Sequence, residues 1–138
     1  MRYARWMSVT SEIFPLLWSD DVAGIADWAT ATLDLKESWR AASDDGVIEH
    51  AELIWPGGRV SINIKADAYA GTGPCGISLR VDDPKRIDEL HQRAVAAGAD
   101  IIQGLEESPI AYSFTARDPD GNQWWVNAET GFLDKLRQ

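Results

Sequence analysis

Few residues in this chain have side chains suited to catalysis. It has two histidines, His50 and His91, and one cysteine, Cys75. Glu52 stands two residues after His50, so both side chains share one face if this segment is a strand. Such a pair can do acid–base work, although most His–Glu pairs on mixed strands are solvated or interface contacts. Arg80 is the cation nearest to Cys75 in sequence, which gives a weak case for a reactive thiol. His91 is expected on a helix.

Tryptophan is the unusual residue, with seven in 138 positions. Indole rings fill cores, and they also stack on planar or cationic groups. Burial statistics favour the core for Trp28, Trp55 and Trp124. Trp124 and Trp125 are consecutive, so on a strand they must face opposite ways. We therefore expect Trp125 to line a binding surface.

Composition narrows the classes of partner. A chain of 138 residues, with 45% hydrophobic and 25% charged residues, is typical of one globular domain. Its net charge of −9 argues against nucleic acid or an anionic membrane as partner, and leaves open a neutral or cationic ligand. No apolar run reaches the roughly 18 residues of a membrane span. The single cysteine excludes an intrachain disulfide framework, so a cytoplasmic protein is expected.

The elements that must position these side chains occur twice. An apolar run ends in two aspartates at 20–21, and another does so 62 residues later, at 82–83. Each pair precedes apolar residues at helical spacing. Ser19 or Asp20 is the expected N-cap of the first helix. Pro84 suits the first turn of the second helix, whose apolar face runs to Ala97, and Gly98 suits its end.

Three predicted strands follow each helix, so the order βαβββ appears twice. They span residues 36–43, 47–55 and 59–65, then 100–105, 111–117 and 123–127. Turn sequences separate them, and Pro56 and Pro119 stand at matching places 63 residues apart. The predicted organisation is an N-terminal extension (1–10), module one (11–65), a linker (66–74), module two (75–128) and a tail (129–138). Phe132, Leu133 and Leu136 would form the apolar side of a short helix in that tail.

Four segments carry a resemblance to a known family: Pro15–Val22, His50–Leu53, Gly76–Asp83 and Phe114–Trp124. They are similar to the vicinal oxygen chelate superfamily, which contains glyoxalase I, extradiol dioxygenases and bleomycin-resistance proteins. The resemblance implies an α+β fold in which two βαβββ modules form a curved, open mixed sheet, a cup, with helices outside. The first helix of the family usually ends in Leu-Gly, whereas this chain has Leu33-Asp34, which predicts a different helix exit.

In glyoxalase I and the dioxygenases, the cup holds a divalent metal bound by the first and last strands of each module. The matching positions here are Phe14, Gly76, Trp125 and, in the closing strand of module one, Ile62, Ser61 or Asn63. Counting from Pro56 selects Ile62, whereas hydrophobic alternation selects Ser61 or Asn63 and is preferred. None offers an imidazole, carboxylate or thiolate. A metal-free member without a cofactor is therefore expected.

Aromatic and amide side chains are expected in the cup instead. The predicted ligand-binding residues are Phe14, Trp18, Trp39, Asn63, Ser78, Arg80, Gln123, Trp125 and Asn127. They favour a homodimeric protein that binds a small aromatic or cationic molecule, as antibiotic-sequestering members of the family do. One alternative is a metal-dependent lyase, isomerase or dioxygenase of the same superfamily that uses His50 and Glu52. Another is a structural or regulatory dimer without a small ligand.

Overall fold

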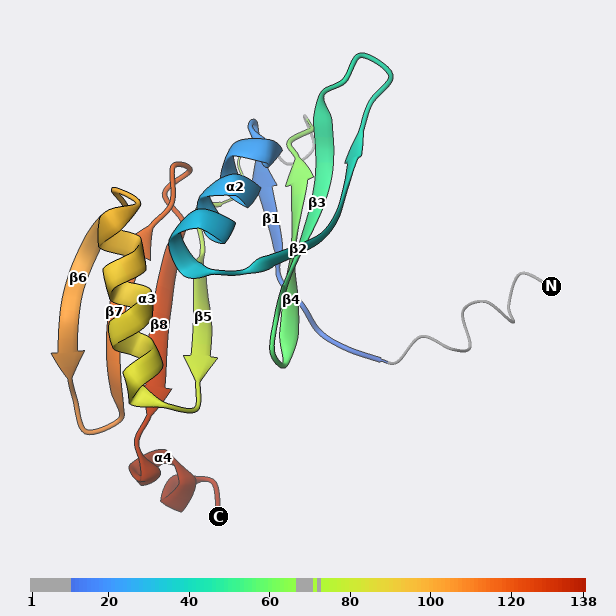
Figure 1. Ribbon diagram of the computed structural model, residues 1–138. Helices are drawn as coiled ribbons and strands as arrows, with labels where there is room; N and C mark the ends of the chain where they lie inside the picture. The colour runs from blue at the N-terminus through green and yellow to red at the C-terminus, as the bar shows by residue number, and fades with distance from the viewer. Residues whose placement is uncertain (1–10, 67–70, 72) are drawn as a thin grey trace.

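The computed structural model describes residues 11–66, 71 and 73–138, so the predicted extension at 1–10 and most of the linker lie outside the described residues. Module one contains β1 (Leu16–Ser19), α2 (Val22–Leu33), β2 (Lys36–Ala42), β3 (Ile48–Trp55) and β4 (Gly58–Ile64). Module two contains β5 (Gly76–Val81), α3 (Pro84–Ala96), β6 (Asp100–Glu107), β7 (Ala111–Arg117) and β8 (Gln123–Glu129). The predicted order βαβββ is therefore confirmed in both halves (Figure 1).

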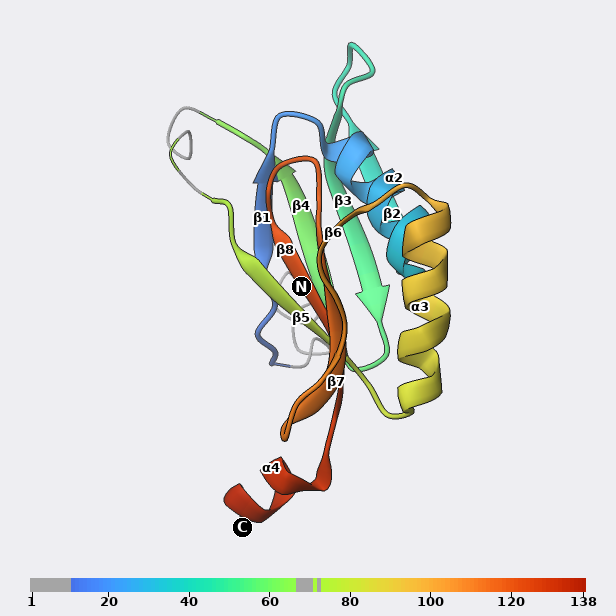
Figure 2. The same ribbon diagram turned by 90° about the vertical axis from the view of Figure 1, so that its left-hand side faces the viewer.

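Each module has its own four-stranded sheet, ordered β1-β4-β3-β2 in module one and β5-β8-β7-β6 in module two. The first strand of each module pairs parallel with the last, and the other pairs are antiparallel. Helices α2 and α3 lie on the same side of the strands (Figure 2). The sheet face away from the helices is called here the open face of each module. This arrangement confirms the predicted α+β fold with open sheets.

Helix α2 begins one residue later than predicted. Its N-cap is Asp21, whose side chain accepts a hydrogen bond from Gly24 N at 3.0 Å. The prediction of Ser19 or Asp20 was wrong because Ser19 still belongs to β1, where its Oγ accepts from Asp21 N at 2.9 Å. The predicted apolar face is buried in full: Val22, Ile25, Ala29 and Leu33.

The exit of α2 also corrects the prediction. Asp34 adopts the left-handed conformation, with φ 61° and ψ 25°, that glycine usually supplies at a helix end. Its carboxylate lies 2.7 Å from Lys36, 2.7 Å from Arg86 and 3.4 Å from Arg93. The hydrogen bond from Lys36 contributes most to lowering the pKa of Asp34. Asp34 thus takes the conformation that glycine usually supplies, and it links α2 to α3.

Helix α3 follows its predicted signals closely. Asp83 is the N-cap, Pro84 is the first helical residue, and Gly98 has a positive φ of 73° just after the helix. Ile87, Leu90 and Ala94 are buried. Ala97 is the exposed C-cap rather than a member of the apolar face, because the helix ends at Ala96.

One core joins the two modules. Trp124 of β8 is fully buried, and its ring centroid lies 5.7 Å from that of Trp28 on α2. Trp55, at the end of β3, donates from Nε1 to the Arg80 carbonyl of β5 at 2.9 Å. Trp28 and Trp55 are partly buried against the core, whereas Trp124 lies inside it. Side chains from both halves therefore fix the relative position of the sheets.

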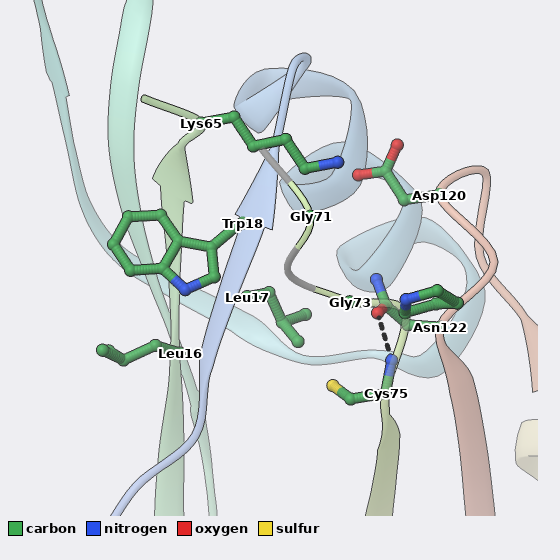
Figure 3. A pocket seen from close by; sticks show the side chains of 10 residues that line it. Leu16, Leu17, Trp18, Lys65, Gly71, Gly73, Cys75, Asp120 and Asn122 are labelled. Carbon is green, nitrogen blue, oxygen red and sulfur yellow. Dashed lines mark hydrogen bonds between the residues drawn. The ribbon is translucent and has the colours of Figure 1, made fainter. Parts of the chain in front are cut away.

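The turn before β8 is organised by one buried carboxylate. Asp118 accepts hydrogen bonds from Asp120 N, Asn122 N, Asn122 Nδ2 and Trp124 Nε1, each at 2.9 Å. Gly121 supplies the positive φ of 89° that this turn needs. Asn122 Oδ1 accepts in turn from Cys75 N at 2.9 Å (Figure 3). The turn thereby holds the start of β5 beside β8 and supports the Gly76–Gln123 pairing.

A short helix, α4 (Gly131–Leu136), follows β8 and extends beyond the end of that strand (Figure 1). Phe132 and Leu136 are exposed, and the side chain of Leu133 lies outside the described part of the structure. Among the described residues, no helix is long and apolar enough to span a membrane.

Candidate functional site

Alternation along β4 decides which residues of module one face outward. Val60 and Ile62 are buried in the core, and Ser61 and Asn63 pair with Leu16 and Trp18 of β1 on the opposite face. The register therefore follows hydrophobic alternation, and the count from Pro56 was wrong. The reason is that apolar side chains must meet the helix, which covers one face only.

Glu52 is the central polar residue on the open face of module one. It is only 8% exposed, and it accepts hydrogen bonds from Arg59 Nη1 at 2.7 Å and Ser38 Oγ at 2.9 Å. Trp39 Nε1 also donates to this carboxylate. The Arg59 hydrogen bond is the main reason why the pKa of Glu52 lies below its usual value. Glu52 is therefore held as a carboxylate between side chains of β2 and β4.

Arg59 connects this carboxylate to an aromatic ring. Its guanidinium lies over the Phe14 ring, with 4.1 Å between its Cζ and the ring centroid, and it also pairs with Glu12. Phe14 is half-buried, whereas Trp39 is 48% exposed. The Glu52–Arg59 pair thus positions two aromatic side chains, Phe14 and Trp39, on the open face.

His50 and Glu52 share the open face, but the structure does not join them as an acid–base pair. His50 Nδ1 lies 3.0 Å from Asn63 Oδ1, while both Glu52 oxygens bind other donors. Asn63 Nδ2 donates to Leu17 O at 3.5 Å, which directs Oδ1 toward the histidine. His50 therefore donates from Nδ1 to the Asn63 amide oxygen. His50 and Glu52 thus have separate hydrogen-bond partners, and their use in acid–base chemistry stays a prediction.

The open face of module two is richer in hydroxyl and amide groups. Gly76, Ser78 and Arg80 alternate with buried Ile77 and Leu79 along β5. On β8, the predicted residues Gln123 and Trp125 are exposed and half-buried, and Asn127 is almost fully buried. Arg80 lies 3.5 Å from Glu129, a carboxylate that pairs more closely with Arg137 at 2.8 Å.

Sequence reasoning missed three polar residues of this face. Thr115 Oγ1 donates to Gln103 Oε1 at 3.0 Å, and Gln103 Nε2 lies 3.4 Å from Ser113 Oγ. Ser113 and Thr115 pair with Asn127 and Trp125 in the sheet. Alternation along β7, where Phe114 and Ala116 are buried in the core, is the signal that could have placed them.

A cleft of about 250 Å³ opens where β1 meets the segment that leads into β5. Leu16 and Trp18 line it from β1, and Lys65 and Asp120 reach toward each other across it (Figure 3). Cys75 also lines the cleft, and burial is the main cause that raises the pKa of its thiol. A protonated thiol is a poor nucleophile, so the structure gives Cys75 no catalytic activation.

The residues present do not fit a divalent metal. Phe14 and Trp125 have no ligating atom, Gly76 has no side chain, and Asn63 is hydrogen-bonded to His50. In the ranges that the structure describes, no group of three or more His, Cys, Asp or Glu side chains could hold a metal ion. The positions that the resemblance assigns to metal ligands therefore carry aromatic rings or neutral groups.

Two repeated modules with open, aromatic faces define a class of protein, and comparison identifies it. The sequence model of the Glyoxalase/Bleomycin resistance protein/Dioxygenase superfamily matches residues 12–126. The chain belongs to this superfamily, which confirms the resemblance seen in the sequence. Among curated proteins, none matches it significantly.

Solved structures share the fold over nearly the whole chain. TioX from Micromonospora sp. ML1 is 28% identical with a TM-score of 0.74, over 88% of this chain and all of TioX. TnmS3, an antibiotic binding protein from Streptomyces sp. CB03234, is 20% identical with a TM-score of 0.67, over 90% of this chain and 99% of TnmS3. A glyoxylase/bleomycin resistance protein/dioxygenase domain from Frankia sp. EAN1pec is 24% identical, with a TM-score of 0.67, over 89% and 94% of the two chains.

The Glu52 arrangement leads to a pH prediction. Its folded-state pKa is lowered, so its stabilisation is present above the unfolded pKa of about 4.3 and is lost as pH falls through the folded value. Glu52→Gln should lower the free energy of unfolding at pH 7 by about 2 kcal/mol. At a pH below the folded pKa, wild-type Glu52 is protonated. The difference in unfolding free energy between the wild type and Glu52→Gln should then nearly disappear.

Urea denaturation at pH 7 and at an acid pH below the unfolded-state pKa of glutamate measures how far this difference narrows. Glu106→Gln is the control, because Glu106 is an exposed residue of β6. It should change the unfolding free energy by less than about 0.5 kcal/mol at either pH. A Glu52→Gln gap that stays constant with pH would show that the Glu52 charge contributes nothing.

Proposed function

We propose that this protein is a metal-free member of the superfamily that binds a small aromatic or cationic molecule and sequesters an antibiotic. The observation that carries the proposal is that Phe14 and Trp125, on the open faces of the two modules, stand at the positions that the resemblance assigns to metal ligands. Flat π surfaces bind planar and cationic groups. The chain's net charge of −9 favours cations over anions.

Other features support the same function. The TnmS3 structure is that of an antibiotic binding protein, and its fold matches this chain closely. Around the aromatic rings, Asn63, Ser78, Arg80, Gln123 and Asn127 supply polar groups that could orient a ligand. We propose a homodimer in the cytoplasm as the working form. The drug then binds on the open faces, and binding keeps it from its target.

The test is a fluorescence titration with a panel of antibiotics that carry planar or cationic groups. Wild-type protein should show saturable tryptophan quenching by at least one of them. Trp125→Ala should weaken that binding about tenfold, since one good stacking contact contributes roughly 1–2 kcal/mol. Trp55→Phe is the matched control, because Trp55 lies on the helix-covered face and donates to the Arg80 carbonyl.

Two results would contradict the proposal. The first is the absence of saturable quenching across the panel. The second is stoichiometric zinc, nickel, iron or manganese in freshly purified protein, together with a catalytic activity that disappears when the metal is removed. The second result would favour the lyase, isomerase or dioxygenase alternative.

A further inference from the structure

Asn127, on the open face of module two, donates hydrogen bonds from its amide nitrogen, whereas its amide oxygen accepts none from the described residues. The side chain is 1% exposed. Its Nδ2 donates to Ser78 Oγ at 2.8 Å, Trp125 O at 3.1 Å and Leu79 O at 3.3 Å. Two of these acceptors are backbone carbonyls, so the reversed amide would set Oδ1 against two oxygens. The orientation of the amide is therefore fixed.

No donor in the described part of the chain makes a hydrogen bond to Asn127 Oδ1. A buried polar atom without a partner is rare in proteins, because its desolvation is not compensated. Arg59 Nε is the one fully enclosed side-chain nitrogen or oxygen without a partner among the described residues. Asn127 Oδ1 is thus not among the fully enclosed atoms, and it is an acceptor without a protein donor in the described part of the chain.

A donor lies directly beside this acceptor. Ser78 is exposed, and its Oγ already accepts from Asn127 Nδ2, so its own proton can point outward to a ligand. Trp125 pairs with Ser78 across the parallel strands and precedes Asn127 by two residues on the same face. The Ser78 hydroxyl, a donor, and Asn127 Oδ1, an acceptor, therefore lie next to each other beside Trp125.

We propose that Ser78 and Asn127 recognise the carboxamide of a neutral planar aromatic ligand stacked on Trp125. The ligand N–H donates to Asn127 Oδ1, and its carbonyl accepts from Ser78 Oγ. Both protein groups are uncharged, so a neutral group with one donor and one acceptor is the complement. A carboxylate would instead set an oxygen anion against Asn127 Oδ1. This inference rests on the proposed function and specifies the ligand class of that surface.

Three ligands of one shape test the proposal on the wild-type protein: 2-naphthamide, 2-acetonaphthone and 2-naphthoate. The ketone keeps the ring and carbonyl but lacks the N–H. The amide should bind about tenfold more tightly than the ketone, measured by calorimetry or ligand-detected NMR. Equal affinities would overturn the inference and leave the stacking surface intact. Tightest binding of the naphthoate would also overturn it and would assign recognition to Arg80.

Substitutions show which side chains cause the tighter binding of the amide. Ser78→Ala should weaken amide and ketone alike, by about fivefold, and preserve the ratio between them. Ser43→Ala removes a hydroxyl from the β2–β3 turn, away from the open face of module two, and should change neither affinity. Asn127→Ala also removes three donor contacts and can fail to fold, so the comparison of ligands on wild-type protein is the primary test. Failure of all three ligands to bind would count against the stacking surface itself.

Discussion

Replacing Trp124 by alanine should lower the free energy of unfolding by about 4 kcal/mol, because truncation of a buried tryptophan leaves a large cavity. Trp124 is 0% exposed and packs against Trp28 with 5.7 Å between ring centroids. The substitution also removes the 2.9 Å hydrogen bond from its Nε1 to Asp118. Urea denaturation followed by circular dichroism measures the loss without relying on the altered fluorescence.

The neighbouring tryptophan is the matched control. Trp125 is half-buried on the open face, so Trp125→Ala should cost less than about 1.5 kcal/mol while it weakens ligand binding. Trp124→Phe keeps a ring and loses the N–H, and it should fall between the two. Equal losses of stability for Trp124→Ala and Trp125→Ala would contradict the assigned directions of the two indoles.

Asp118→Asn should have the second large effect on stability. It should lower the free energy of unfolding by about 3 kcal/mol, although the two side chains have almost the same shape. In the wild type, Asp118 Oδ1 accepts from two backbone N–H groups, and Oδ2 accepts from Asn122 Nδ2 and Trp124 Nε1. An asparagine amide can offer only one acceptor oxygen. Its NH₂ would face two donors, and at least one buried donor would lose its partner.

Asp120→Asn, in the same turn, is the control for Asp118→Asn. Asp120 is exposed, so its substitution should change the unfolding free energy by less than about 0.5 kcal/mol. Chemical denaturation of the two variants side by side makes the comparison. Similar stabilities for Asp118→Asn and wild type would show that the turn does not depend on the carboxylate.

Local patterns were sufficient to predict the repeated architecture. Strand alternation identified Ile62 as a core residue and placed Trp124 and Trp125 on opposite faces, because a sheet covered on one side imposes a period of two. Pro84 and Gly98 marked the ends of α3, since each residue type suits its backbone position. These features depend on neighbours within a few residues, which a single sequence displays directly.

The polar contacts of the candidate site could not be predicted in the same way. Glu52 is bound by Ser38 from β2 and Arg59 from β4, and the β2–β3 register is interrupted beside Trp39. That interruption changes which side chains reach the carboxylate, and no residue pattern signals it. The orientation of Asn127 likewise depends on carbonyls of two different strands. Long-range contacts of this kind appear only once the sheets are assembled.

The residue at the end of α2 has a consequence for protein engineering. Asp34 holds Arg86 and Arg93 of module two, whereas in module two the residue with positive φ after the helix is Gly98. The positions in module one that match the two arginines are Gly24 and Ala31. A symmetric protein built from two copies of either half would therefore lack one side of this electrostatic link. The halves are related as repeats but are no longer interchangeable parts, and a symmetrised design would have to supply a new connection at this point.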